Sequence, residues 1–232
     1  MKSKIRMIHI GKTGGSALKT MFDLNAVELK AKGFNVQGRN HSVTLEEIRR
    51  RGHNNIVFFV RHPVSRFVSA FNSRLRQGAP RYHSPWNRGE RIAFKHFKEP
   101  NELAEALSAE NWKVWAAANQ SMVSIGHVKD LMGKWLSSAE FLEANRDILF
   151  YLGTTETMDE DVANLFAKMG IASPNKELDE VSRHVTPAGY SRTLSDKAVA
   201  NLTQWYAKDI EIYEWCIANR AMINQQSVAR RR

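Results

Sequence analysis

Two short runs of this 232-residue chain carry groups that bind phosphate. The first is Gly11-Lys-Thr-Gly-Gly-Ser16, which lies between an apolar stretch and a helical pattern. Such a turn directs backbone N–H groups at an anion, and the N-terminus of the following helix adds partial positive charge. Thr13 and Ser16 would add hydroxyl donors, and the adjacent glycines allow close approach of the backbone. The run predicts an anion-binding turn, although a tight strand-to-helix turn with a solvated lysine would contain the same residues.

The second run is Arg61-His-Pro-Val-Ser-Arg-Phe-Val-Ser69, which follows the apolar residues 55–60. Pro63 suits the first position of a helix, so Arg61 would precede that helix and Ser69 would lie two turns into it. Ligands of open parallel sheets bind beyond the carboxyl ends of the strands. We therefore expect Lys12 and Arg61 to converge on one ligand, and a ligand with two separated phosphate groups would suit both.

The elements around these runs alternate between strand and helix. Short apolar stretches predict strands at 4–10, around Val36, at 55–60 and at 147–153. Helical spacing predicts helices at 17–29, 44–51, from 63 onward, through most of 92–145, at 158–169 and at 195–218. Thr44 and Glu47 would form a capping box, and Trp112, Trp115 and Trp135 would be packing residues. The alternation predicts a single α/β domain with a parallel sheet.

Residues 77–91 predict a long, basic surface loop that is rich in Gly, Pro, Arg and Tyr. Loops of this length are usually functional or disordered. The loop and its flanks would either hold an anionic acceptor or form a solvated basic face through Arg74, Arg76, Arg81, Tyr82, Arg88 and Arg91. We expect residues 225–232 to form a disordered tail.

The net charge of +10, from 34 Lys and Arg against 24 Asp and Glu, favours an anionic partner without selecting one. The one cysteine, Cys216, excludes an intrachain disulfide. No apolar stretch is long enough to be a signal peptide or to span a membrane, so we expect a cytoplasmic protein with no membrane span.

Both runs resemble motifs of the sulfotransferases that use 3′-phosphoadenosine 5′-phosphosulfate (PAPS). Lys12-Thr-Gly-Gly-Ser16 resembles their 5′-phosphosulfate loop, and Arg61 to Ser69 resembles their 3′-phosphate motif. The pattern is similar to carbohydrate sulfotransferases of the heparan sulfate 2-O-sulfotransferase type. Residues 40–45 match the place of the catalytic histidine in that family, residues 152–156 a late core strand, and residues 182–186 a loop that closes over the nucleotide.

The resemblance implies a P-loop-like three-layer α/β fold, with a central parallel sheet flanked by helices, in one sulfotransferase domain of residues 1–232. It implies transfer of the sulfuryl group of PAPS to an acceptor hydroxyl without a metal, which releases adenosine 3′,5′-bisphosphate. Lys12 would stabilise this leaving group. The cofactor-binding residues that it implies are Lys12, Thr13, Gly14, Gly15, Ser16, Ala17, Arg61, Ser69, Arg183 and Thr186.

The acceptor hydroxyl needs a base, and histidine titrates near neutrality. His41 is the candidate, at the position where the resembled family carries its catalytic histidine. We expect His9 to be a strand residue packed near the first run and His62 to point away from the ligand, whereas His184 could touch the cofactor. The expected acceptor contains a sugar, and the basic loop is compatible with an anionic one.

Three rival functions use the same residues. A P-loop kinase or phosphotransferase would place its lysine after the glycines, in G-x-x-x-x-G-K-[ST], whereas Lys12 precedes Gly14 and Gly15. A nucleic-acid-binding protein would explain the charge, but the chain has no helix-turn-helix, zinc or RNA-binding signature. A catalytically inactive PAPS-binding scaffold would keep both phosphate motifs. We expect no nucleic-acid partner.

Overall fold

The computed structural model describes residues 3–37, 41–80, 82–175, 187 and 189–226. The chain divides into two compact units. The first unit comprises Met1–Arg61, Met132–His184 and Glu211–Arg232, and the second comprises His62–Leu131 and Val185–Ile210. The assignment of one domain to the whole chain stays a prediction.

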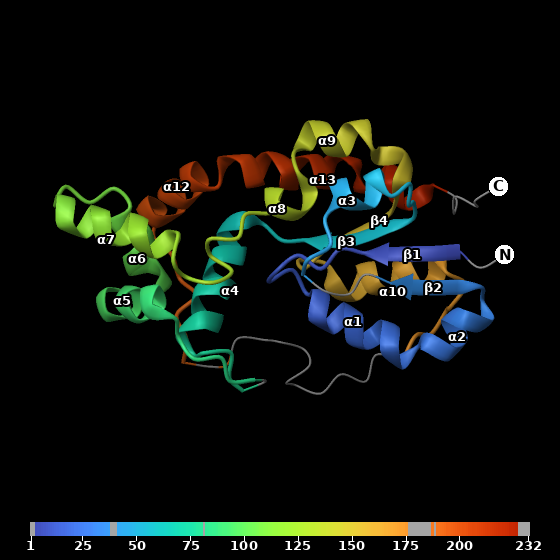
Figure 1. Ribbon diagram of the computed structural model, residues 1–232, viewed down its shortest axis with the longest axis horizontal. Coiled ribbons are helices and arrows are strands. Elements are labelled where there is room, and N and C mark those ends of the chain that lie inside the picture. Colours follow the sequence, from blue (N-terminus) through green and yellow to red (C-terminus); the bar gives the residue numbers. More distant parts are fainter. Residues whose placement is uncertain (1–2, 38–40, 81, 176–186, 188, 227–232) are drawn as a thin grey trace. The chain divides into compact units, whose positions relative to one another are not determined.

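The described part of the first unit contains a four-stranded parallel sheet in the order β2-β1-β3-β4 (Figure 1). Its strands are β1 (Ser3–Met7), β2 (Phe34–Gln37), β3 (Ile56–Val60) and β4 (Leu149–Thr154). From β1 the chain crosses to one side to form β2 and then to the other side to form β3. The topological switch point, where ligands of such sheets bind, therefore lies between β1 and β3.

Helices cover both faces of this sheet, because side chains of β3 alternate between two cores (Figure 1). Val57 and Phe59 pack in a core with helices α1 (Gly15–Leu24), α2 (Ala26–Ala31) and α10 (Met158–Lys168). Ile56, Phe58 and Val60 pack in the opposite core. The helices of that core are α3 (Leu45–Arg50), α8 (Gly133–Leu136), α9 (Ala139–Ala144) and α13 (Ala207–Gln225). The fold is thus the three-layer, P-loop-like α/β fold expected from the sequence.

The second unit is helical and has a core of its own. It contains α4 (Pro63–Leu75), α5 (Arg88–His96), α6 (Pro100–Ala106), α7 (Trp112–Met122) and α12 (Asp196–Trp205). Phe67 packs with Phe71 and Tyr206, and Phe71 meets Phe94 edge-on. Arg66 is buried and donates to the carbonyls of His127 and Asp130, and its guanidinium lies 3.9 Å from the buried Asp209 carboxylate, which balances its charge inside this core.

Asn224 and Lys168 fasten the end of α13 to the edge of the sheet. The Asn224 amide exchanges two hydrogen bonds with the backbone of Leu152 in β4, at 2.8 and 2.9 Å. Lys168 donates to the carbonyls of Phe150 and Ile223. Burial lowers the pKa of Lys168 to about 8. A side chain thus occupies part of the strand edge that a neighbouring strand would otherwise pair with.

The predicted strands are confirmed with shifted ends, and the long C-terminal helix is corrected. β1 ends at Met7 rather than residue 10, although the Ile8 N–H still donates to Val57. A short 3₁₀ turn, Arg146–Ile148, precedes β4. The helix expected at 195–218 is interrupted at Tyr206, and the second part continues to Gln225. Residues 227–232 of the expected tail lie outside the described residues.

The three tryptophans do not share one role. Trp135 is 2% exposed and packs as expected, but Trp112 and Trp115 are 70% and 48% exposed, so their assignment to a core was wrong. The side of α7 that is buried carries Ala118, Ser121 and Met122 instead. Helical spacing alone could not show which side of α7 packs.

The basic loop is shorter than expected because Asn87 and Glu90 form a capping box that begins α5 at Arg88. Arg74 is also not exposed. It is buried, and its Nε lies 2.6 Å from Glu90 Oε1. Arg74 therefore holds this segment together instead of facing an acceptor, while Arg88 and Arg91 are exposed. Arg81 lies outside the described residues.

The expected cap of α3 is half confirmed. The Thr44 side chain accepts from the Glu47 N–H at 3.2 Å, as a capping box requires. The Glu47 carboxylate instead pairs with Arg51, one turn further along α3. None of the described helices combines the length and the apolar character needed to cross a bilayer.

Candidate active site

The first phosphate-binding run forms a turn at the carboxyl end of β1, and α1 begins directly after it. Lys12 and Gly14 both take left-handed backbone conformations, with φ of 68° and 77°. Among the described residues no side chain caps the N-terminus of α1, and its first turn, which begins at Gly15, contains no acidic residue. This helix end therefore keeps the partial positive charge that attracts anions.

Thr13 stabilises the turn from inside. Its side chain is buried, and its hydroxyl donates to the Ile10 carbonyl at 3.0 Å. The sequence suggested this hydroxyl as a donor to phosphate, whereas the structure uses its proton within the turn. Any contribution of Thr13 to anion binding would come from its backbone N–H. Ser16 and Ala17 follow in the first turn of α1.

The two glycines are required by neighbours within the first unit. A Cβ on Gly14 would lie 3.1 Å from Met158 Sδ, and the left-handed backbone there already disfavours other residues. A Cβ on Gly15 would lie only 2.2 Å from Cδ2 of the His9 ring. The expectation that His9 packs near the turn is confirmed. The sequence offered phosphate approach as the reason for these glycines, and the structure adds this internal packing.

Arg61 follows β3 and Lys12 follows β1 at the same end of the sheet, because β1 and β3 are parallel neighbours. Both residues thus flank the topological switch point. Ser69 lies two turns into α4 of the second unit, and its pairing with Arg61 stays a prediction. The three late-loop candidates, Arg183, His184 and Thr186, lie outside the described residues.

His41 is held against the first run by its Nδ1 atom, which lies 2.9 Å from the His9 carbonyl oxygen. A carbonyl oxygen only accepts hydrogen bonds, so Nδ1 donates, and in the neutral ring the lone pair is then on Nε2. The His41 and His9 rings lie 3.9 Å apart between centroids, with 33° between their planes. The Trp135 indole donates to the His41 carbonyl at 2.8 Å. His41 itself is exposed, and its role as a base stays a prediction.

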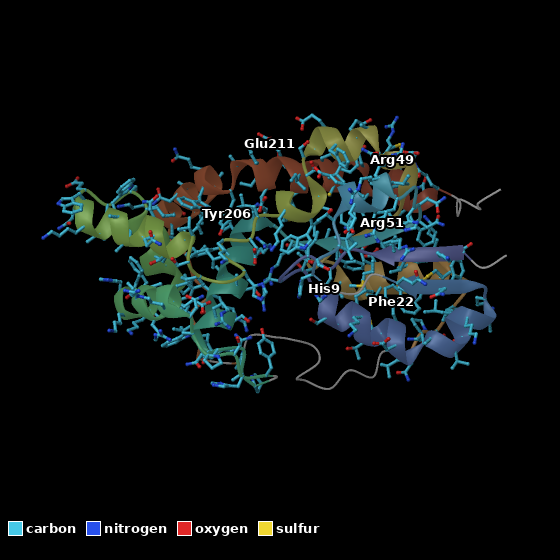
Figure 2. The ribbon with its side chains drawn as sticks, viewed as in Figure 1. His9, Phe22, Arg49, Arg51, Tyr206 and Glu211 are labelled. Carbon is cyan, nitrogen blue, oxygen red and sulfur yellow. The ribbon has the colours of Figure 1, made fainter. Side chains whose placement is uncertain are left out.

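Sequence reasoning placed His9 near the turn and Trp135 in the packing, but it connected neither residue with His41. Figure 2 shows His9 where β1 leads into the turn, close to the start of α1. His9 is 7% exposed and lies two residues before Gly11, which was the available signal for a role beside the turn. Trp135 is 94 residues away from His41, and no local pattern connects them.

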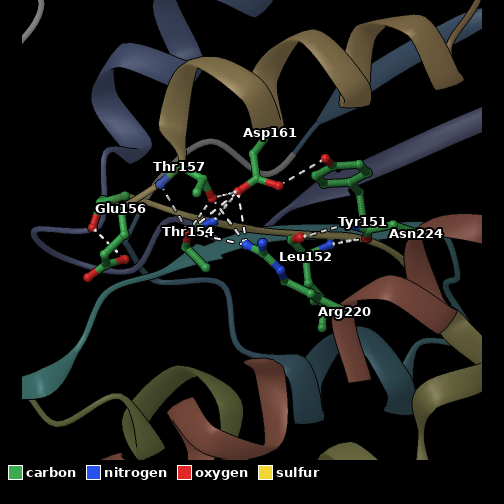
Figure 3. A network of polar contacts seen from close by, with 9 residues as sticks. Tyr151, Leu152, Thr154, Glu156, Thr157, Asp161, Arg220 and Asn224 are labelled. Atoms are coloured by element: carbon green, nitrogen blue, oxygen red, sulfur yellow. Dashed lines mark hydrogen bonds and ion pairs between the residues drawn. The ribbon is translucent and has the colours of Figure 1, made fainter. Parts of the chain in front are cut away.

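A polar network around the buried Asp161 joins the end of β4 to α10 and α13 (Figure 3). Asp161 accepts from the Thr154 N–H at 2.9 Å, the Thr157 hydroxyl at 2.6 Å and the Tyr151 hydroxyl at 3.1 Å. Burial and the Asp161 charge raise the pKa of Tyr151, so this hydroxyl keeps its proton. Arg220 reaches the same carboxylate at 3.5 Å. Thr155 and Met158, which pack against Gly14, lie within this segment.

Replacing Asp161 by asparagine is expected to destabilise the fold. The amide cannot accept from all these donors, and the Arg220 charge would lose its counterion, so we expect a loss of about 2–3 kcal/mol in the free energy of unfolding. Urea denaturation measures this loss. Glu160→Gln is the matched control, because Glu160 is an exposed acid in the same first turn of α10. Equal stabilities of the two variants would contradict a structural role for the network.

Among the described residues no group of three or more His, Cys, Asp or Glu side chains is arranged to hold a metal ion. The expectation that the protein needs no metal stays a prediction.

The sheet, its covering helices and the turn at the switch point define an α/β protein of the P-loop-like class. The sequence profile of the sulfotransferase family matches residues 1–215. The chain therefore belongs to the sulfotransferase family, and this membership supports an enzyme that transfers sulfuryl groups. No curated protein and no solved structure gives a significant match to it.

Proposed function

We propose that the protein transfers the sulfuryl group of PAPS to a hydroxyl of a sugar-containing acceptor. Members of the sulfotransferase family generally take PAPS as the donor. The observation that carries the proposal is the exit of Lys12 and Arg61 from neighbouring parallel strands at the switch point, beside the uncapped start of α1. Two phosphate-binding groups at one sheet edge suit a nucleotide with phosphates at both its 5′ and 3′ positions.

The residues of the first unit fit the charge of such a donor. The N-terminus of α1 would bind the 5′-phosphate through the backbone N–H groups of Thr13 to Ala17, and Arg61 would bind the 3′-phosphate, together with Ser69. PAPS supplies the activated sulfuryl group when it is bound. In the reaction the acceptor oxygen bonds to sulfur while the bond from sulfur to the bridging phosphate oxygen breaks.

Lys12 has the role of stabilising the leaving group. Negative charge develops on the bridging oxygen as its bond to sulfur breaks, and an ammonium group nearby lowers the energy of that state. The left-handed backbone at Lys12 belongs to the turn that leads into α1, which keeps the residue at the helix end. In our proposal Arg183 and Thr186 close over the nucleotide.

His41 has the role of general base. Its Nδ1 proton is committed to the His9 carbonyl, so the acceptor hydroxyl proton would pass to Nε2. The hydrogen bond from the Trp135 indole to the His41 carbonyl limits movement of His41 during this transfer. The exposed Arg88 and Arg91 and the net charge of +10 support an anionic sugar acceptor.

Thermal unfolding with three ligands tests the donor assignment. We expect adenosine 3′,5′-bisphosphate to raise the melting temperature, because a ligand at a hundredfold excess over its Kd stabilises the folded state by about 2.7 kcal/mol. AMP, which lacks the 3′-phosphate, should stabilise much less. A larger shift with ATP and Mg²⁺ than with the bisphosphate would indicate a phosphotransferase and overturn the proposal.

A further inference from the structure

The His9 ring lies between two parts of the proposed site whose relative position matters for catalysis, the turn before α1 and the His41 ring. On one side its edge packs so closely on Gly15 that a Cβ there would lie 2.2 Å from Cδ2 and 2.6 Å from Nε2. On the other side the ring lies 3.9 Å from the His41 ring. His9 is almost completely buried, so both contacts belong to the packing of its ring inside the first unit.

We propose that His9 is a positioning residue, whose ring sets the place of the His41 base relative to the turn that holds the sulfuryl donor. This inference rests on the proposed function, and on His41 as its base. The main chain of His9 fixes one ring nitrogen of His41, and the side chain of His9 supports the face of the same ring. Together these contacts restrict both the rotation and the tilt of the His41 imidazole.

The carbonyl contact alone cannot fix this position. A hydrogen bond to Nδ1 restrains one atom of the His41 ring and does not by itself set the tilt of the ring plane, on which the place of Nε2 depends. The adjacent His9 ring opposes a change of tilt, and Gly15 limits how far the His9 ring itself can shift. Attack on sulfur must be in line, and misplacement of a reacting group by about 1 Å can cost about 10²-fold in rate. The contact between the two rings is therefore a means of keeping the base aligned.

Two apolar variants distinguish the effect of a planar ring at position 9 from the effect of side-chain volume alone. His9→Phe keeps a planar ring between Gly15 and His41, whereas His9→Leu fills the space without one. With water as the acceptor, the hydrolysis of saturating PAPS should slow by about tenfold or more in His9→Leu. It should stay within about threefold of the parent rate in His9→Phe and in the control His96→Ala, an exposed histidine of α5. Equal rates in the Leu and Phe variants would overturn the proposal.

A double-mutant cycle tests whether His9 acts through His41. If it does, His9→Leu should have little further effect on the hydrolysis rate in a His41→Ala background. A full additional loss in that background would mean that His9 acts in another way.

The tautomer of His41 gives a readout that needs neither donor nor acceptor. Two-bond ¹⁵N–¹H couplings in the full-length protein should show one dominant tautomer, with the proton on Nδ1, in the parent and in His9→Phe. His9→Leu should show averaging between the two tautomers. Failure of adenosine 3′,5′-bisphosphate to bind would remove the proposed function and leave this measurement intact, whereas an unchanged tautomer in His9→Leu would remove the positioning role alone.

Discussion

Replacing Lys12 by methionine is expected to slow sulfuryl transfer from PAPS by about 10²–10³-fold, the cost of removing one group that stabilises developing charge in an active site. Methionine keeps an unbranched side chain of similar length, so the turn before α1 should persist. The loss should appear in the rate at saturating PAPS, because the charge on the bridging oxygen is greatest in the transition state. Release of adenosine 3′,5′-bisphosphate measures this rate.

Lys19→Met provides the matched control for this variant. Lys19 is an exposed lysine of α1, about one turn beyond the first residue of this helix, and its loss changes the net charge by the same amount. We expect its rate to equal that of the parent. If the Lys12 and Lys19 variants are equally active, Lys12 does not stabilise the leaving group, and the turn serves only for binding or packing.

The placement of Lys12 and Arg61 after the carboxyl ends of β1 and β3 could be predicted because its signals are local. The continuous apolar run of β3 is buried at every position, as a strand covered on both faces should be. The glycines of the first run and the proline after Arg61 mark the ends of the strands and the starts of α1 and α4. These features depend on neighbours within a few residues, which periodicity and turn chemistry report.

What the sequence could not predict depends on contacts across long stretches of chain. The Trp135 indole reaches His41 and the Arg220 guanidinium reaches Asp161, and neither contact leaves a local pattern. The same reason explains the wrong assignment of Trp112 and Trp115. Their spacing is helical, but only the packing of α7 decides which of its sides is buried. The division into two units is likewise a property of contacts between distant segments.

The first run shows that a correctly identified motif does not determine the role of each of its residues. Residue types suggested that the Thr13 hydroxyl faces phosphate and that Gly15 admits phosphate. The structure shows the hydroxyl bonded inside the turn and Gly15 in contact with His9. A motif constrains which residues are present, but the direction of each side chain depends on the backbone conformation of its residue, and the backbone of Lys12 is left-handed.

Replacing His41 by alanine is expected to reduce the rate of sulfuryl transfer by about 10²–10⁴-fold, the usual contribution of a general base. The effect should be confined to catalysis. His41 contacts the His9 carbonyl through its ring, and the contact from Trp135 goes to its main chain, which alanine retains. Stabilisation by adenosine 3′,5′-bisphosphate should therefore match that of the parent, as thermal unfolding can show.

The separation of these two readouts is what identifies a base. His53→Ala is the control, because His53 lies in the same unit and accepts a hydrogen bond from Arg6 at 3.1 Å. It should retain both the rate and the ligand-induced shift. A His41→Ala protein that loses the shift together with the rate would place His41 in donor binding. One that keeps both would leave the acceptor hydroxyl without its proposed base and assign the contact between the His9 and His41 rings a purely structural role.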